Sequence, residues 1–196
     1  MDTTIYLVRH GTTAANLENR FAGRTAEILH DDGVKQITAV GKRLCDKGIT
    51  QIIASPLERT TQSAKILSRL LNAPMATNAA FNEIAIPHWD GLDKNVITER
   101  FGPEYPHWLE TPHTFQSPDC ETLAIVGDRA VGGIERLLEE HAGKTILVIS
   151  HLIALRCLAL HYQDLPLAQF RSIRITNAAL CKLTRNEKHQ TAFSFL

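Results

Sequence analysis

The sequence predicts an α/β fold, a three-layer α/β/α sandwich around a mainly parallel central sheet. Two observations predict it. Short apolar runs typical of buried strands alternate along the chain with longer segments whose apolar residues recur at helical spacing. The strands predicted at residues 5–8, 49–54 and 144–149 also end abruptly in polar residues. Ligands bind at the carboxyl ends of parallel strands in open α/β sheets, so these polar residues are candidates for a site.

The first predicted helix runs from Val34 to Leu44, where the apolar residues follow helical spacing. Residues 31–33 offer candidate N-caps, and Gly48 is placed to end the helix. The preceding segment, residues 16–30, shows no clear periodicity and is expected to form a loop with a turn at Gly23.

The second predicted helix follows the strand at 49–54 and runs to Asn72. Ser55 is a typical N-cap, and Pro56 suits the first helical position, where its missing N–H is not needed. Arg59 then lies on the first turn, where unpaired amides and the helix dipole attract anions.

Residues 84–120 are expected to form a short lid inserted into this framework. A short strand is predicted before it at 75–81, and a short helix within it at 93–101. The segment 102–119 is rich in proline, which favours an extended excursion over a core element. Because the lid is too short to be a separate domain, residues 1–196 are expected to form a single domain.

The C-terminal part predicts a long helix, a buried strand and a short helix, followed by edge strands. The long helix is expected at 121–142, although Gly132 and Gly133 each disfavour it by roughly 1 kcal/mol relative to alanine. The strand at 144–149 ends at His151, and the short helix follows. Short strands are predicted at residues 172–176, 179–183 and 190–195. The last two are expected to pair as an edge hairpin, which offers an edge for a homodimer.

Composition and charge exclude several classes of partner. The 196 residues carry 21 basic and 21 acidic side chains, and the net charge of +0 lacks the basic excess that nucleic acid or an anionic membrane normally requires. No apolar run is long enough to span a bilayer, and the N-terminus lacks the pattern of a signal peptide. The four cysteines show neither zinc-site spacing nor a dense disulfide framework. We therefore expect a cytoplasmic protein with reduced thiols and with no nucleic-acid or membrane partner.

Three predicted strand ends bring cations and imidazoles toward one edge of the sheet. Arg9 and His10 follow the first strand, Arg59 follows the second, and His151 follows the last parallel one. The planar fork of arginine suits bidentate phosphate binding, and histidine can act as a nucleophile or proton carrier near neutral pH. Gly11 is expected to allow a sharp turn or a close approach to a ligand. Together these residues suit a phosphate monoester, which carries about −1.5 to −2 charges near neutral pH.

The whole pattern resembles the histidine phosphatase superfamily, which includes cofactor-dependent phosphoglycerate mutases and many small phosphatases. Five matching motifs occur in the family's order and span most of the chain: Arg9-His10-Gly11-Thr12-Thr13 with Asn16, Arg20-Phe21-Ala22-Gly23, Ser55-Pro56-Leu57-Glu58-Arg59-Thr60, Glu83 followed by Trp89-Asp90-Gly91, and Ser150-His151. The resemblance implies a phosphoglycerate mutase-like fold.

The resemblance also implies catalytic roles. His10 would be the nucleophile that becomes a phosphohistidine. Three residues would hold the phosphoryl oxygens: Arg9, Arg59 and His151. Glu83 would protonate the leaving oxygen and then activate water.

Three further residues are expected to bind substrate, and no metal or cofactor is implied. Asn16 would donate a hydrogen bond to the phosphate, and Gly23 and the backbone amide of Leu152 would complete the site. Leu152 stands where the family commonly has glycine. Other departures from the family pattern are Thr12, Pro87-His88 and Cys120. They leave the identity of the substrate open.

The leading interpretation is a metal-independent phosphomonoesterase that hydrolyses a small phosphorylated metabolite through a phosphohistidine. One alternative is a phosphoglycerate mutase-type phosphotransferase, although mutases of the family carry longer insertions. A second is a non-catalytic phospho-ligand sensor, which would need the cations but not the nucleophile and acid. A phosphoprotein phosphatase would need an open pocket. Substrate selection is expected from residues 88–120, with Arg100 a candidate for binding a substrate carboxylate.

Overall fold

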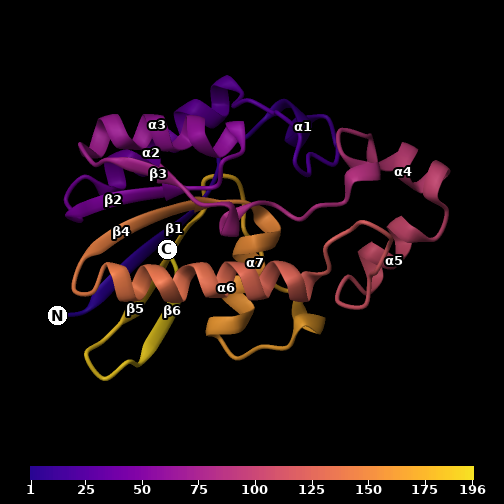
Figure 1. The fold of residues 1–196 in the computed structure, drawn as a ribbon. Helices are drawn as coiled ribbons and strands as arrows, with labels where there is room; N and C mark the ends of the chain where they lie inside the picture. The colour runs from indigo at the N-terminus through magenta and orange to yellow at the C-terminus, as the bar shows by residue number, and fades with distance from the viewer.

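The computed structural model describes residues 1–196 as a six-stranded sheet with helices on both faces (Figure 1). The strands are β1 (Thr3–Arg9), β2 (Ile49–Ala54), β3 (Met75–Thr77), β4 (Thr145–Ser150), β5 (Leu180–Arg185) and β6 (Thr191–Phe195). Their order in the sheet is β3-β2-β4-β1-β5-β6. The first four in this order are parallel, and β5 and β6 add an antiparallel hairpin at one edge. The predicted fold class is confirmed.

Seven α-helices and three single 3₁₀ turns connect the strands. The helices are α1 (Ala14–Leu17), α2 (Asp31–Leu44), α3 (Glu58–Leu71), α4 (Lys94–Phe101), α5 (Glu104–Glu110), α6 (Leu123–Glu140) and α7 (Leu152–Tyr162). The 3₁₀ turns are η1 (Ala79–Phe81), η2 (Pro87–Trp89) and η3 (Leu167–Gln169). Helices α2 and α3 cover one face of the sheet, and α6 and α7 cover the other (Figure 1). None of the helices has the length and apolar character needed to cross a membrane.

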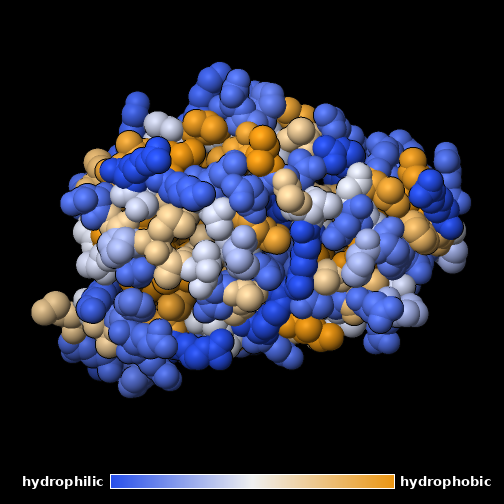
Figure 2. Space-filling model, turned by 45° about the horizontal axis from the view of Figure 1, so that its top comes forward, coloured by the Kyte–Doolittle hydropathy of each residue, from blue (hydrophilic) through white to orange (hydrophobic).

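The central strands are buried on both faces, which explains why they read as continuous apolar runs. Ile5 and Leu7 of β1 pack in the core beneath α6 and α7. Tyr6 and Val8, which alternate with them, pack in the second core beneath α2 and α3. On the outside, the face shown in Figure 2 is largely hydrophilic with small apolar patches, because the apolar sides of the helices are turned inward.

The lid extends beyond the carboxyl ends of the parallel strands and contains α4 and α5 (Figure 1). The prediction that residues 102–119 form an extended excursion outside the core is wrong. Trp108 and Phe115 belong to the larger hydrophobic core, and both pack against the fully buried Trp89 with ring centroids 6.3 and 5.2 Å from it. The prolines permit α5 because Pro103 and Pro106 fall at its start, where backbone N–H groups have no partner inside the helix.

Two predicted helix starts also differ from the structure. Helix α3 begins at Glu58 rather than at Pro56, with Leu57 in the N-cap position. Ser55 lies two residues before this N-cap, and its hydroxyl accepts from the amide of Leu57 at 3.4 Å while it also takes part in a tertiary hydrogen-bond chain described below. Helix α2 begins at Asp31, and its N-cap is His30, whose ring accepts a hydrogen bond from the backbone of Asp32.

Two predicted strands are shortened or missing. The strand expected at 75–81 ends at Thr77, and the single turn η1 follows it. No strand forms at 172–176. The carbonyl groups of Ile173 and Ile175 in this segment instead accept hydrogen bonds from arginine side chains, so they do not pair with a strand.

Two adjacent glycines in α6 lead to opposite stability predictions. A Cβ added at Gly132 meets no atom within 4 Å, so Gly132→Ala is expected to raise the free energy of unfolding by about 0.5–1 kcal/mol. A Cβ added at Gly133 would lie 2.9 Å from the Cβ of Ala80 and 3.1 Å from the ring of Phe81. Gly133→Ala is therefore expected to lower the free energy of unfolding by about 1–3 kcal/mol. Urea unfolding of both variants measures the two changes, and the same sign for both would contradict this packing of α6 against η1.

Candidate active site

A pocket of about 270 Å³ lies at the carboxyl ends of β1 and β4, between the sheet and the lid. Seven of the predicted site residues line it: Arg9, His10, Asn16, Gly23, Arg59, Glu83 and Leu152. The eighth, His151, lies beside it, with its ring centroid 5.2 Å from that of His10. Arg100, the predicted carboxylate ligand, does not line the pocket.

His10 follows β1 and is held in one tautomer. The residue is 3% exposed, and Nδ1 lies 2.8 Å from the backbone oxygen of Gly11. A carbonyl oxygen only accepts hydrogen bonds, so Nδ1 carries the proton. The lone pair is therefore on Nε2, which lies 3.2 Å from Nε of Arg59. A neutral imidazole that carries its lone pair on Nε2 has the form required of a nucleophile.

Arg59, at the start of α3, ties the two imidazoles to the loop before α2. The residue is 1% exposed, and its Nε lies 3.2 Å from both His10 Nε2 and His151 Nδ1. Its two terminal nitrogens donate to the carbonyl oxygens of Thr25 at 3.2 Å and Gly23 at 2.6 Å. The contact that the structure shows for Gly23 is thus its support of Arg59.

Two glycines permit close packing around this site. Gly23 has a φ of +46°, and a Cβ there would lie 1.7 Å from Oδ1 of Asp90, so glycine is required on both counts. A Cβ on Gly11 would lie 2.4 Å from the backbone oxygen of Gly33. The close approach expected at Gly11 is therefore to the chain itself, at the start of α2, rather than to a ligand.

His151 is the N-cap residue of α7 and has the opposite tautomer to His10. Its Nδ1 accepts from Arg59, so its proton is on Nε2, which donates to Oγ of Ser55 at 2.8 Å. The hydroxyl of Ser55 in turn donates to Oδ1 of Asn82 at 2.7 Å. This chain fixes the ring of His151.

Burial and positive charge keep both imidazoles neutral. Burial, and then the neighbouring charges of Arg59 and Arg9, hold the pKa of His10 well below its usual range. The pKa of His151 is lowered in the same way, first by burial and then by Arg59. Burial also lowers the pKa of Arg9, to about 10, so its guanidinium stays charged near neutral pH.

Arg9 and Asn16 each retain a donor that the protein does not use. Arg9 donates from Nη1 to the backbone oxygen of Ile175 at 2.9 Å, but its buried Nε has no acceptor. The Oδ1 atom of Asn16 accepts from the backbone of Thr13 at 3.1 Å and from Nδ2 of Asn177 at 2.9 Å. The side-chain NH₂ of Asn16 is therefore oriented by two contacts and remains able to donate into the pocket.

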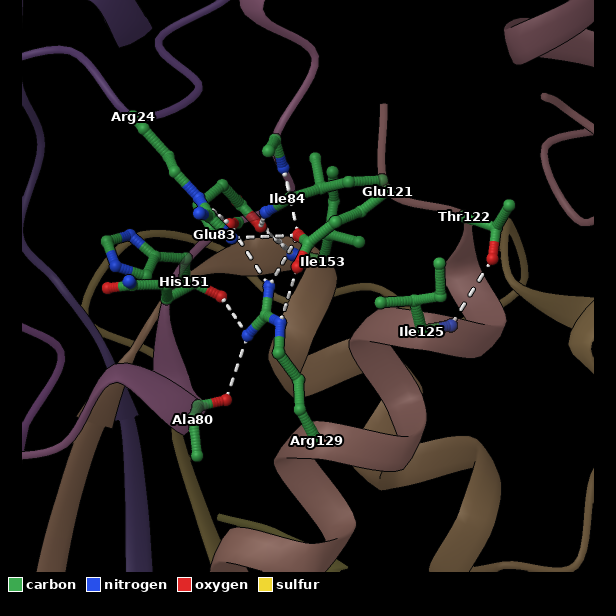
Figure 3. A network of polar contacts seen from close by, with 12 residues as sticks. Arg24, Ala80, Glu83, Ile84, Glu121, Thr122, Ile125, Arg129, His151 and Ile153 are labelled. Atoms are coloured by element: carbon green, nitrogen blue, oxygen red, sulfur yellow. Dashed lines mark hydrogen bonds and ion pairs between the residues drawn. The ribbon is translucent and has the colours of Figure 1, made fainter. Parts of the chain in front are cut away.

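Glu83 lines the pocket from the segment after η1 (Figure 3). The residue is 8% exposed, and its carboxylate accepts from the backbone amides of Ile84 at 3.0 Å and Ile153 at 3.3 Å. The amide of Ile153 belongs to the first turn of α7, where backbone N–H groups have no partner inside the helix. The expected acid and the expected nucleophile thus line the same pocket.

An ion-pair network holds the backbone around Glu83 in place (Figure 3). Glu121 is 2.9 Å from Arg129 and 2.9 Å from Arg24, and its carboxylate also accepts from the amide of Ala85 at 3.0 Å. Both arginines donate to the carbonyl oxygen of Glu83, at 3.0 Å from Arg24 and 3.2 Å from Arg129. Arg129 donates to two more carbonyl oxygens at 2.8 Å, those of Ala80 and Asn82.

None of the three charged residues of this network, Arg24, Glu121 and Arg129, was predicted to have a role. One signal was available for Arg129, because it lies on the buried side of α6, three residues after Val126 and four before Gly133. An arginine within an apolar stripe needs partners for its charge. Arg24 and Glu121 lie in irregular segments and offered no such signal.

Two residues that depart from the family pattern, His88 and Cys120, are in contact in the lid. The Sγ atom of Cys120 lies 3.7 Å from Nδ1 of His88, and Nε2 of His88 lies 2.7 Å from the carboxylate of Glu104. A third departure, Thr12, bonds through its amide and hydroxyl to the side chain of Gln36. None of these residues lines the pocket.

Fold and site together define an α/β protein with a buried histidine–arginine pocket for an anionic group. The family model of the histidine phosphatase superfamily (branch 1) matches residues 5–195. The chain belongs to this superfamily.

A known relative agrees with this assignment, and solved structures share the fold. The chain is 31% identical over 187 residues to a probable phosphoglycerate mutase, GpmB, of Yersinia pestis (strain Pestoides F), covering 93% of this chain and 85% of the relative. The structure of Bacillus stearothermophilus YhfR matches with a TM-score of 0.94 and 24% identity, covering 98% of this chain and 96% of that one. The α-ribazole phosphatase of Shigella flexneri matches with a TM-score of 0.88 and 21% identity, covering 98% and 95%. Both structures share the fold described above.

The two buried neutral imidazoles predict a loss of stability in acid. The pKa values of His10 and His151 are low in the folded chain, whereas histidines in an unfolded chain titrate near 6.5. Below about pH 6.5 the unfolded chain binds more protons, so stability is expected to fall by up to about 1.4 kcal/mol per pH unit for each ring. Urea unfolding between pH 5 and 7.5 measures this slope.

His10→Gln removes one of these rings. The slope of the free energy of unfolding against pH is therefore expected to be shallower by up to about 1.4 kcal/mol per pH unit, the contribution of one proton. His113→Gln is the matched control, since His113 is exposed, and it should keep the wild-type slope. A wild-type slope in His10→Gln would contradict the neutral, buried state of His10.

Proposed function

We propose that the protein is a phosphomonoesterase that hydrolyses a small phosphorylated metabolite through a phosphohistidine, without a metal ion. The observation that carries the proposal is the tautomer of His10. Its Nδ1 proton is bound by the carbonyl of Gly11, which leaves the Nε2 lone pair beside the guanidinium of Arg59. Membership of the histidine phosphatase superfamily supports it.

In the first step, Nε2 of His10 attacks the phosphorus atom and the bond from phosphorus to the ester oxygen breaks. Glu83, in its protonated form, gives its proton to the leaving oxygen, so a neutral alcohol departs. The unused donors of Arg9 and Asn16 would bind the phosphoryl oxygens, together with Arg59. A bound phosphate also favours a protonated His151, whose Nδ1 can then donate to the same oxygens.

In the second step, the carboxylate of Glu83 takes a proton from water as the water oxygen attacks phosphorus. The bond between phosphorus and Nε2 breaks, and the lone pair returns to His10. Inorganic phosphate leaves, and Glu83 is again protonated for the next cycle. The amides of Ile84 and Ile153 fix the position of the Glu83 carboxylate through both steps.

Phosphotransfer of the phosphoglycerate mutase type is the second candidate function. The name of the Yersinia pestis relative, probable phosphoglycerate mutase GpmB, favours it. The same first step serves both reactions, which differ only in whether water or a second alcohol accepts the phosphoryl group. The assay must therefore detect both products.

Phosphate release in EDTA tests the leading function. The panel consists of phosphoserine, phosphoglycerates, sugar phosphates, nucleotides and α-ribazole phosphate. The wild type is expected to release phosphate from at least one, and His10→Ala is expected to abolish release, because no other group in the pocket can form the intermediate. His113→Ala, an exposed position, is the control and should keep wild-type rates.

The other outcomes are informative. Interconversion of phosphoglycerates without phosphate release would establish phosphotransfer. Binding of esters without turnover would establish a sensor, and loss of release in EDTA would contradict a metal-independent reaction.

The leaving group tests Glu83 as the acid. Glu83→Gln keeps an oxygen that can accept from Ile84 and Ile153 but has no proton to transfer. For alkyl phosphates, kcat/KM is expected to fall by about 10²- to 10⁴-fold. For p-nitrophenyl phosphate, whose phenolate leaves without protonation, the first step is expected to change far less, measured as the p-nitrophenol burst. Equal losses in that step for both substrates would contradict the role of Glu83 as acid.

A further inference from the structure

The lid side of the active-site pocket carries cations that the proposed phosphoryl transfer does not use. Lys94 comes from the start of α4, Arg156 from α7 and Arg171 from the loop after η3, and all three line the same pocket as His10. They therefore border the space that an ester bound beside His10 would occupy.

None of these cations is paired with a carboxylate. Arg156 donates to the backbone oxygen of Ile173 at 2.7 Å, and Arg171 donates to that of Trp108 at 2.6 Å. Lys94 donates to the side-chain oxygen of an asparagine at 3.0 Å. All of these acceptors are neutral.

The other residues that line the pocket do not neutralise the charges of Lys94, Arg156 and Arg171. Glu83 is the only carboxylate that lines it. The other lining cation outside the phosphoryl site, Arg20, is already paired with Glu18 at 2.8 Å and Glu27 at 2.7 Å. The three lid-side cations thus form a local excess of positive charge.

An aromatic ring holds the two arginines near one another. The guanidinium carbons of Arg156 and Arg171 lie 5.0 and 5.8 Å from the ring centroid of Phe170, and Arg171 is also 5.6 Å from that of Trp108. These contacts orient the planar forks. Burial lowers the pKa of Arg156, and the charge of Arg171 lowers it further. Two like charges held together in a partly buried pocket are stabilised when an anion lies between them.

We propose that Arg156 and Arg171 bind a second anionic group of the substrate, assisted by Lys94. This inference rests on the proposed function. The phosphoryl group carries about −1.5 to −2 charges, which Arg9 and Arg59 match. The remaining cations then select phosphate monoesters that bear a carboxylate or a second phosphate. The bidentate fork of arginine suits both groups.

Two pairs of esters test the second anionic group and distinguish its two sources. 3-Phosphoglycerate and glycerol 3-phosphate differ by a carboxylate, and fructose 1,6-bisphosphate and fructose 6-phosphate differ by a phosphate. In at least one pair, the wild type is expected to prefer the more anionic member by about tenfold or more in kcat/KM. Arg171→Gln is expected to reduce that preference by about tenfold, because it removes the charge from one of the two forks. Arg171→Lys, which keeps the charge, should retain more of the preference.

Arg174→Gln is the matched control, because Arg174 lies in the same loop, is exposed and does not line the pocket. It should keep the wild-type preference. No preference in either pair, or an equal loss for both members in Arg171→Gln, would overturn the second anionic subsite while leaving a His10-dependent phosphatase intact. If no ester is turned over, the proposed function fails. Calorimetric titration of the protein with the same two pairs of esters then measures their affinities and shows whether the second anionic subsite exists. Equal affinities within both pairs would then overturn it.

Discussion

The buried guanidinium of Arg59 is the interaction on which the rest of the site depends. A charge with 1% exposure is tolerated only when its donors are satisfied, and here they reach two imidazoles and two backbone carbonyls. These contacts select opposite tautomers for His10 and His151 and bring the turn at Gly23 against α3. The proposed nucleophile His10, the second histidine and the loop before α2 are therefore positioned by one side chain.

Much of this site was predictable because it follows from the topology of the sheet. Apolar runs identified the strands, and parallel strands in one sheet bring their carboxyl ends to one edge. Arg9, Arg59 and His151 could therefore be expected to converge before any contact was known. The long helix α6 and the edge hairpin of β5 and β6 were predicted from local patterns in the same way.

The features that sequence reasoning missed depend on partners far along the chain. Ser55 has the pattern of an N-cap, but its hydroxyl is bound by Asn82 and His151, whose proximity no local rule can supply. The strand expected at 172–176 is absent because arginines of β1 and α7 take its carbonyl groups. The prolines of the lid concealed a core element, since proline is compatible with the first turn of a helix such as α5.

The strand order also determines when the site can form during biosynthesis. The strand β1, which His10 follows, is made first, yet in the sheet it lies between β4 and β5, whose residues begin at 145 and 180. Until those residues have left the ribosome, β1 has no neighbour on either side, and the lone pair of His10 has no pocket around it. Such long-range pairing slows folding and leaves an apolar strand without partners meanwhile. A nascent chain that has reached only the lid therefore carries His10 without the pocket that surrounds it in the folded protein.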